Sequence, residues 1–395
     1  MVRDEPLLAS PTGSVERIAS LDLLRGIALL GMLVVHFHVH TAETAGLNDL
    51  VRTLVWRLVE TKSHGTFALL FGAGFAIQLR RARARGGPFA GLYVRRLFIL
   101  ALFGFAAHAL FGYNVLLGYA IWGIPLLLMR NWSTRALLLT ACLSALSMSS
   151  YRAAADWYVR TTAGPAAATA VLEARRAEAV AVNEALHAAE AQESYRTLLA
   201  ARLRQMAWFH AQPFFFLPNA TLTLFIAGFL MIRHRLFEVP HAHKRLLGLV
   251  AVAGVLSWAA DNWLLPGAGI SSAGLLRDQW LTFAYVNGAL LLLNRPAVLR
   301  ALHPVAGAGR MALTNYLLQI VALDLLFSGY GLGLGSILPV TGLTAALTCF
   351  AVQTALSSFW LARWRFGPAE WLWRSLTYKR LQPMRRTALA DAAAL

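Results

Sequence analysis

Charged residues and cysteines are scarce in this chain. Only 14% of its 395 residues are Asp, Glu, Lys or Arg, whereas 58% are hydrophobic. An ordinary soluble domain carries about 25% charged residues, so the composition argues against a soluble protein. The two cysteines, Cys142 and Cys349, both fall in apolar segments, so a structural disulfide is not expected.

The apolar residues gather in long runs, several of which reach the roughly 20 residues that a membrane-spanning helix needs. The pattern predicts ten spans, at 21–40, 63–80, 93–111, 114–129, 134–150, 213–232, 246–264, 274–293, 312–328 and 337–361. We therefore expect an all-α polytopic membrane protein.

Acidic residues are fewer than basic ones, at 19 Asp and Glu against 36 Lys and Arg, which gives a net charge of +17. If the N-terminus is cytoplasmic, nearly all the basic residues of short loops fall on the cytoplasmic side, as the positive-inside rule requires. Both termini are then cytoplasmic, and the charge is explained without nucleic acid. A basic inner face attracts anionic lipids, so membrane lipids are expected partners.

The order of the segments divides the chain into four parts. Residues 1–150 hold the first five spans with the candidate donor and catalytic residues, and 211–365 hold the last five. Residues 151–210 form an extracytoplasmic insertion rich in Ala, Glu and Arg, a composition that favours helix. This insertion is either a solvated cap or a lid over an outer opening. Residues 366–395 form a cytoplasmic interfacial tail.

The first span carries two ionisable residues, Arg25 and His36. Such residues are costly in hydrocarbon and usually mark a function. They are eleven positions apart, which is roughly 16 Å and about three helical turns, so both face the same way. A cation near one membrane face and an imidazole near the bilayer centre fit a long phosphorylated cofactor with a reactive far end. Alternatively, Asp22 only neutralises Arg25.

His36 is the better placed general base, because a neutral imidazole in an apolar site can take a proton from an alcohol or amine. His40 shares its face, but two histidines without a third ligand are weak evidence for a metal, and none is predicted. Glu60 and His64 cluster before the second span. They are either interfacial charges or catalytic: Glu60 would orient an imidazole, and His64 would itself be the base.

Two further groups of residues have open interpretations. Arg80, Arg83, Arg95 and Arg96 belong to a basic loop that either follows the positive-inside rule or forms a phosphate-binding mouth beside Arg25. Asn315 and Gln319 lie four apart on the ninth span. Such amides either join helices or line a substrate cavity.

Several segments resemble the YeiB-like membrane proteins, a bacterial family long labelled as of unknown function. The resemblance rests on SLDLLRGIALLGMLVVH in the first span, GRMALTNYLLQ in the ninth and RFGPAEWLWRSLTYKR near the end. FALLFGAGFA and YVRRLFIL add to the match, which runs over nearly the whole chain.

The family is distantly similar to the type-three membrane acyltransferases and to heparan-alpha-glucosaminide N-acetyltransferase. The type-three enzymes carry an Arg and a His separated by ten residues in the first span, as Arg25 and His36 are. They also carry two arginines three apart near the donor, to which Arg80 and Arg83 would correspond. YeiB-like members often have Asn where His36 stands, so two readings stay open: a true acyltransferase, or a family role that needs no imidazole.

The resemblance implies an acyltransferase of the bacterial plasma membrane that uses cytosolic acyl-coenzyme A, with acetyl the first choice. The acceptor would be a hydroxyl or amine of a sugar, a lipid-linked glycan or a secreted small molecule, and His40, Asn315 and Gln319 are the candidates to bind it. A homo-oligomer stays open. The alternative is a transporter or lipid flippase, in which the same residues line a translocation path. Binding of acyl-coenzyme A distinguishes the two.

Overall fold

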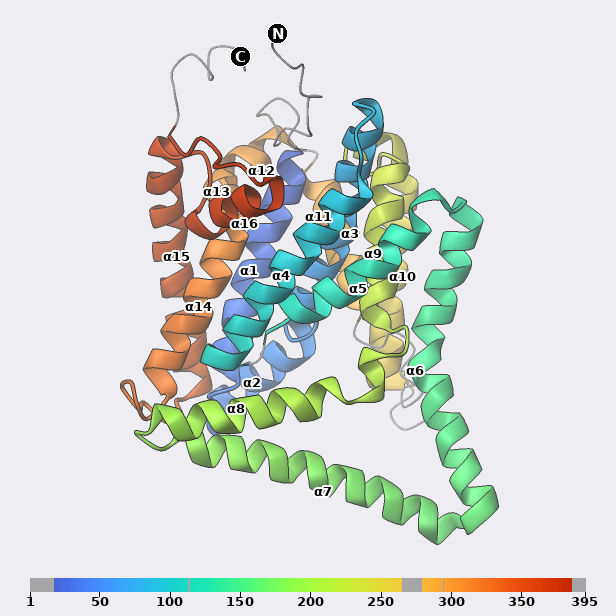
Figure 1. The fold of residues 1–395 in the computed structure, drawn as a ribbon, viewed down its shortest axis with the longest axis vertical. Helices are drawn as coiled ribbons and strands as arrows, with labels where there is room; N and C mark the ends of the chain where they lie inside the picture. The colour runs from blue at the N-terminus through green and yellow to red at the C-terminus, as the bar shows by residue number, and fades with distance from the viewer. Residues whose placement is uncertain (1–17, 113, 265–278, 294, 386–395) are drawn as a thin grey trace.

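The computed structural model describes residues 18–385 except for 113, 265–278 and 294. These residues form a helical bundle, and apart from two isolated bridges, Thr41 with Ile337 and Trp364 with Arg385, they contain no β-structure. The start of α1 and the last described residues, after α16, lie at the same end of the bundle (Figure 1). The all-helical prediction is confirmed.

A helix lies at each of the ten predicted spans. The bounds are α1 (Ala19–His38), α3 (Lys62–Ala84), α4 (Ala90–Phe111), α5 (Leu116–Leu128), α6 (Thr134–Ala163), α9 (Ala220–Arg233), α10 (Lys244–Ala259), α11 (Gln279–Leu293), α14 (Ala312–Phe327) and α15 (Pro339–Arg363). The first five residues of the predicted span 274–293 lie outside the described residues.

Among the described helices, α1, α4 and α15 are long and apolar enough to cross a membrane. A fourth candidate is a broken span, made of α13 (His303–Arg310) and α14, which meet at 79°. Three shorter helices complete the two ends of the bundle: α2 (Leu47–Leu58), α12 (Pro296–Ala301) and α16 (Pro368–Tyr378).

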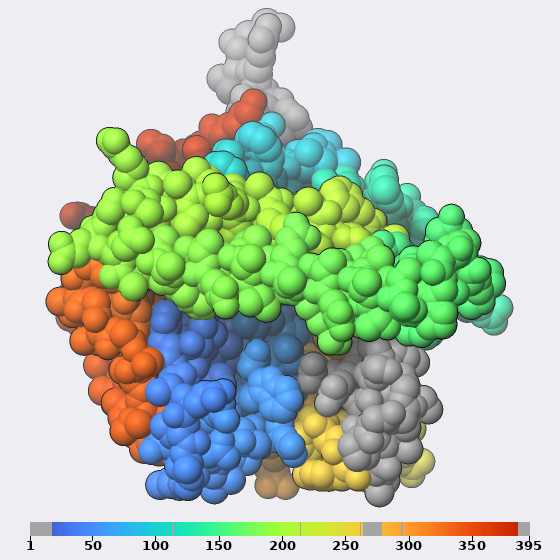
Figure 2. All heavy atoms as spheres, turned by 90° about the horizontal axis from the view of Figure 1, so that it is seen from below, coloured from blue at the N-terminus to red at the C-terminus, as the bar shows by residue number. Residues whose placement is uncertain are grey.

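The predicted insertion is helical. It contains the end of α6, then α7 (Pro165–Glu190) and α8 (Tyr195–His210). Helix α6 contains the predicted fifth span at 134–150 and continues beyond it to Ala163, where Gly164 (φ 89°) and Pro165 stop it. Seen from below, α7 and α8 lie side by side across one half of this end and leave the segment around α2 uncovered (Figure 2).

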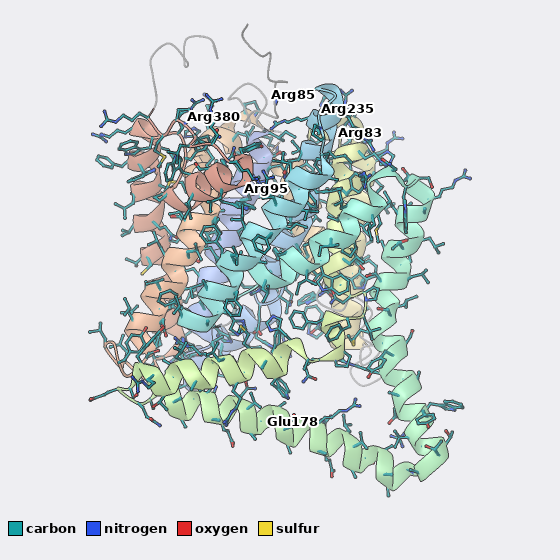
Figure 3. All side chains as sticks on the ribbon, in the orientation of Figure 1. Arg83, Arg85, Arg95, Glu178, Arg235 and Arg380 are labelled. Carbon is teal, nitrogen blue, oxygen red and sulfur yellow. The ribbon has the colours of Figure 1, made fainter. Side chains whose placement is uncertain are left out.

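Arginines gather at the opposite end. Arg83, Arg85, Arg95, Arg235 and Arg380 lie there, at the end where α1 begins, whereas Glu178 lies on α7 at the far end (Figure 3). The structure therefore places the most basic loops on one face of the bundle, as the sequence predicts for an inner membrane face.

Glycines allow four helices to touch backbone to backbone. A Cβ on Gly72 of α3 would lie 1.9 Å from the carbonyl oxygen of Phe225 in α9, and one on Gly228 would lie 1.8 Å from that of Leu69. The same holds between α1 and α13, where a Cβ on Gly309 would lie 1.8 Å from the Asp22 oxygen. Small residues at such crossings let helices approach closely without lipid between them.

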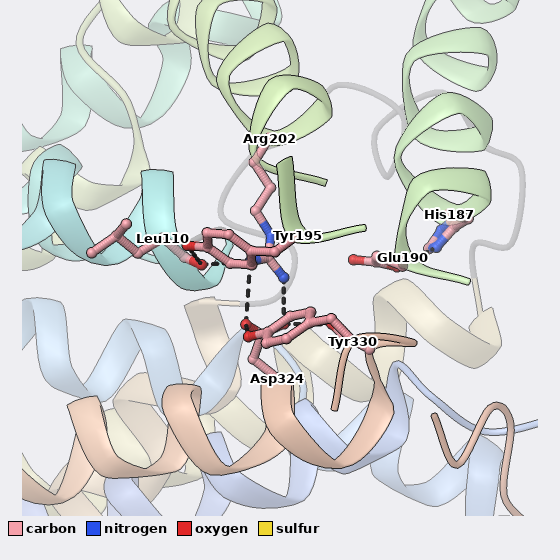
Figure 4. Close-up of polar contacts among 8 residues, drawn as sticks. Leu110, His187, Glu190, Tyr195, Arg202, Asp324 and Tyr330 are labelled. Carbon is pink, nitrogen blue, oxygen red and sulfur yellow. Dashed lines mark hydrogen bonds and ion pairs between the residues drawn. The ribbon is translucent and has the colours of Figure 1, made fainter. Parts of the chain in front are cut away.

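A buried ion pair fastens α8 to the bundle (Figure 4). Arg202 and Asp324 pair with side chains only 2% and 4% exposed, and Arg202 Nη1 also donates to the Leu110 oxygen at 2.5 Å. The Ser328 and Tyr330 hydroxyls donate to Asp324 at 2.6 and 2.5 Å. Burial and this hydrogen bond raise the pKa of Tyr330 to about 12, so the phenol keeps its proton. The insertion is thereby joined to α4 and to the end of α14.

We expect Gly72→Ala to lower the unfolding temperature in detergent, because an added methyl forces the α3 and α9 backbones apart at a cost of about 1–3 kcal/mol. Gly91→Ala is the matched control, since nothing lies within 4 Å of a Cβ at that helical position. There alanine should be neutral or slightly stabilising. Equal unfolding temperatures for the two variants would contradict the close contact.

We expect Asp324→Asn to destabilise the protein by about 3–5 kcal/mol, because it leaves the Arg202 charge buried and uncompensated. Thermal unfolding and the rate of proteolysis within 165–210 measure this. Asp156→Asn breaks the exposed Arg160–Asp156 pair on α6 and should change neither. If both variants behave like the wild type, the ion pair does not hold the insertion in place.

Candidate active site

Arg25 lies at the basic end of α1, where this helix packs between α13 and α3. Its Nη1 donates to Asp22 Oδ1 at 2.7 Å, so the predicted i,i+3 ion pair is present. Across from Arg25, Gly74 of α3 has no side chain, and a Cβ there would lie 3.9 Å from Nη2. Arg25 therefore both pairs with Asp22 and borders an open space.

That space is a cavity of about 180 Å³ with a strongly basic lining. Five helices or their connections supply its six arginines, and Asp22 is the one carboxylate among its lining residues. The arginines are Arg25, Arg81, Arg85, Arg96, Arg310 and Arg374. Guanidinium groups match phosphate oxygens in shape and charge, so this cavity, which we call the basic mouth, suits a ligand with several anionic groups.

A second cavity, of about 230 Å³, continues from the mouth into the bundle. The two share several lining residues, among them Arg25, Gln78 and Arg96, and are therefore adjoining. Aromatic side chains dominate the deeper part: Phe67, Phe71, Phe75, Tyr93, Tyr119, Tyr316 and Trp373. The basic mouth thus leads into an apolar chamber.

Helix α16 closes one side of both cavities. The Arg96 guanidinium lies over the Trp373 ring, 3.7 Å from its centre. Glu370 accepts hydrogen bonds from the backbone of Leu313 and Thr314 at 2.6 and 3.1 Å, and so caps the start of α14. Burial raises the pKa of Glu370, while these hydrogen bonds oppose that shift by favouring its charged form.

Two histidines lie beside the deep end of the chamber. The His36 ring is 5.9 Å from the ring of Tyr316, which lines the chamber. The Tyr119 hydroxyl, also in the lining, donates to the His64 carbonyl at 2.7 Å. His36 and His64 are close enough to interact electrostatically. His36 Nδ1 is buried and has no hydrogen-bond partner among the described residues. The structure thus brings together a basic mouth, an apolar chamber and, in contact with the Tyr316 wall of that chamber, an imidazole.

The predicted basic residues separate into two groups. Arg96 lines both cavities, and Arg95 donates to the Thr377 oxygen at 3.1 Å, next to them. Arg80 and Arg83 instead line another cavity on the far side of α3. At about 100° per residue, positions 80 and 83 lie about 60° apart on a helix, and positions 81 and 85 face a different direction. The helical period thus places Arg81 and Arg85, rather than Arg80 and Arg83, beside Arg25.

The predicted acceptor residues occupy different places. The His40 ring stacks on Phe327, with centres 4.0 Å apart. Asn315 donates to the Ala308 oxygen and to Ser357 at 3.0 and 2.9 Å, so it joins α14 to α13 and α15. Neither His40 nor Asn315 belongs to the lining of the two cavities.

Gln319 and Glu60 complete the predicted set. Gln319 donates to Gln353 of α15 at 2.8 Å, which is again a contact between helices. Glu60 lies in the turn before α3, and its carbonyl accepts from the Lys62 amide at 2.8 Å. Neither residue lines the two cavities.

Sequence reasoning missed the contribution of the C-terminal segment. It placed Trp373 and Arg374 in a cytoplasmic interfacial tail and gave Glu370 no role. These residues are more than 270 positions from Arg96, so no local spacing connects them. Tyr119 and Tyr316 were likewise missed as lining residues. A signal for the α3 side does exist: Gly74, Gln78, Arg81 and Arg85 recur every three or four residues, as one helical face does.

Comparisons with known protein families match two separate segments of the chain. Residues 17–173, which include α1 and α3 to α6, match the family described as heparan-alpha-glucosaminide N-acetyltransferase, catalytic. Residues 231–380, which include α14 to α16, match a family described as protein of unknown function (DUF418). No solved structure matches the chain.

Two uncharacterized bacterial proteins align with almost the whole of this chain. The uncharacterized protein YxaH of Bacillus subtilis is 30% identical over 95% of this chain and 97% of its own length. The uncharacterized protein YeiB of Escherichia coli is 28% identical over 93% of this chain and 98% of its own length. The chain belongs to the YeiB-like family of membrane proteins, with a distant acyltransferase similarity in its first half.

Proposed function

We propose that the protein is a multi-pass enzyme of the bacterial plasma membrane that transfers an acyl group from cytosolic acyl-coenzyme A to a hydroxyl or amine. The observation that carries this proposal is the basic mouth at the Arg25 end, which continues into an apolar chamber that ends beside His36. The match of residues 17–173 to an acetyltransferase catalytic family supports it.

The positive charge of the mouth is complementary to the negative charge of the proposed donor. Coenzyme A carries several phosphate charges at one end and a thioester at the other. Arg25, Arg96 and Arg310 would hold the phosphates, because charged hydrogen bonds between Arg and phosphate are among the strong ones. Only the apolar end of the donor would then enter the deeper part of the chamber, because the aromatic residues that line this part offer no charge to compensate phosphate.

His36 would act on the acceptor at the far end of the chamber. Its unpartnered Nδ1 is available to accept the proton of the acceptor hydroxyl or amine. The acceptor oxygen or nitrogen would attack the thioester carbonyl, the carbon–sulfur bond would break, and the thiolate would take the proton from the imidazole. Holding the two substrates in line would supply much of the rate. His64 is the neighbouring candidate for this role.

The proposed function also includes an orientation of the helices in the membrane. Ten helices would cross the membrane, with both termini and the basic mouth on the cytoplasmic side and α7 and α8 outside. The clustering of arginines at one end of the bundle supports this orientation. The acceptor would then arrive from the end that α7 and α8 partly cover.

We expect acetyl-coenzyme A to bind the purified protein, and Arg25→Ala to weaken this binding roughly 10–100-fold, the equivalent of one lost charged hydrogen bond. Titration calorimetry measures both. Arg300→Ala is the control, because it removes an exposed arginine that does not line the mouth. Wild-type affinity in Arg25→Ala would refute the donor site, and absence of binding to folded wild type would favour the transport alternative.

We expect His36→Ala to bind acetyl-coenzyme A normally but to transfer label from it into membrane components about 10²–10⁴-fold more slowly, the usual effect of losing a general base. Inside-out vesicles with radiolabelled acetyl-coenzyme A provide the measurement. His38→Ala is the matched control on the same helix, because two positions correspond to about 200° of rotation and His38 therefore faces away from His36. Unchanged transfer in His36→Ala would exclude His36 as the base.

A further inference from the structure

The cavity on the far side of α3 is a second basic site, separate from the proposed donor mouth. Its volume is about 520 Å³, and its lining combines arginines with an apolar floor. The charged residues are Arg80, Arg83, Arg233, Arg235 and Glu238, and the floor includes Leu79, Phe229 and Ile232.

The charges of this cavity do not balance. Glu238 is the one carboxylate of its lining, and it pairs with Arg80 at 2.5 Å and with Arg235 at 3.4 Å. Arg83 and Arg233 have no carboxylate partner in the part of the chain that the structure describes. Two of the four arginines therefore keep an uncompensated charge.

Neutral groups hold these two guanidinium groups in place. Arg83 Nη2 donates to Asn131 Oδ1 at 2.7 Å and to the Arg130 oxygen at 3.1 Å. Arg233 Nη1 donates to the Trp132 oxygen at 2.8 Å, and its guanidinium lies over the Phe229 ring. All three acceptors belong to the connection between α5 and α6, so one short segment orients both cations.

The two cations are close enough to repel each other. An arrangement that fixes like charges side by side costs free energy unless an anion offsets it. The frame that holds them is also rigid, because Gly72 and Gly228 bring α3 and α9 into backbone contact below the cavity. The site is therefore built in advance for a negative group and does not need to form around it.

The surroundings favour a lipid as the source of that negative group. The apolar side chains of Leu128 and Trp132, beside the connection that holds the cations, are 69% and 41% exposed. Exposed apolar groups next to a basic cavity at the cytoplasmic end of a bundle are typical of anionic lipid sites. We propose that this cavity binds the phosphate of an anionic phospholipid of the inner leaflet, whose chains lie along the apolar surface beside it.

The test compares lipid retention by two double variants. The protein is reconstituted in vesicles of phosphatidylcholine with or without phosphatidylglycerol, extracted in mild detergent and examined by native mass spectrometry. We expect the wild type to retain phosphatidylglycerol selectively. The variant Arg83→Gln/Arg233→Gln should retain it roughly 30-fold more weakly, the combined contribution of two arginines near an anionic headgroup. The variant Arg245→Gln/Arg300→Gln loses the same charge from exposed positions outside the cavity and should behave like the wild type.

Two further measurements separate the alternatives. Equal unfolding temperatures of the two double variants in phosphatidylcholine alone show that both are folded. The variant Arg83→Lys/Arg233→Gln, which keeps the charge at position 83, should retain more phosphatidylglycerol than Arg83→Gln/Arg233→Gln. Undiminished retention in Arg83→Gln/Arg233→Gln would overturn the proposal. So would complete displacement of phosphatidylglycerol by millimolar inorganic phosphate, because the cavity would then be a site for soluble phosphate.

Discussion

Backbone contact between helices at glycine is the constraint on which both basic cavities depend. Gly26 and Gly309 bring α1 against α13, and Gly72 and Gly228 bring α3 against α9. With these contacts fixed, α1 and α13 present Arg25 and Arg310 to one space. Side chains at the crossings would separate the helices by several ångströms, and a cluster of arginines that converges on one ligand would be lost.

Arginines have different surroundings at the two ends of the bundle. Near the insertion, Arg202 is buried with Asp324, and the Ser328 and Tyr330 hydroxyls satisfy the remaining carboxylate lone pairs, as a buried ion pair requires. At the basic end, the lining of the mouth holds six arginines and, among the residues that the structure describes, Asp22 as its one carboxylate. The first arrangement is buried and joins the insertion to the bundle. The second surrounds an open space with cations, as a site for an anionic ligand would.

The sequence predicted the parts of the structure that follow local rules. The lengths of the apolar runs located the ten helices at the predicted spans, helical periodicity placed Arg25 and His36 on one face of α1, and composition predicted the helical insertion. It did not predict that Trp373 and Arg374 of α16 cover the mouth, because that contact is set by the packing of distant helices. The side of α3 that Arg80 and Arg83 occupy was predictable from the helical period, but the family resemblance favoured their pairing with Arg25.

Asp22 gives the mouth a property that arginines alone would lack. Six guanidinium groups around a cavity of about 180 Å³ repel one another when no anion is bound, and the Arg25–Asp22 hydrogen bond of 2.7 Å offsets part of that repulsion. The same carboxylate competes with an incoming phosphate for Arg25. It therefore stabilises the empty site and weakens the binding of an anion. In the proposed acyltransferase this competition would favour release of the spent donor, whereas a permanent structural anion site would be better served without the carboxylate.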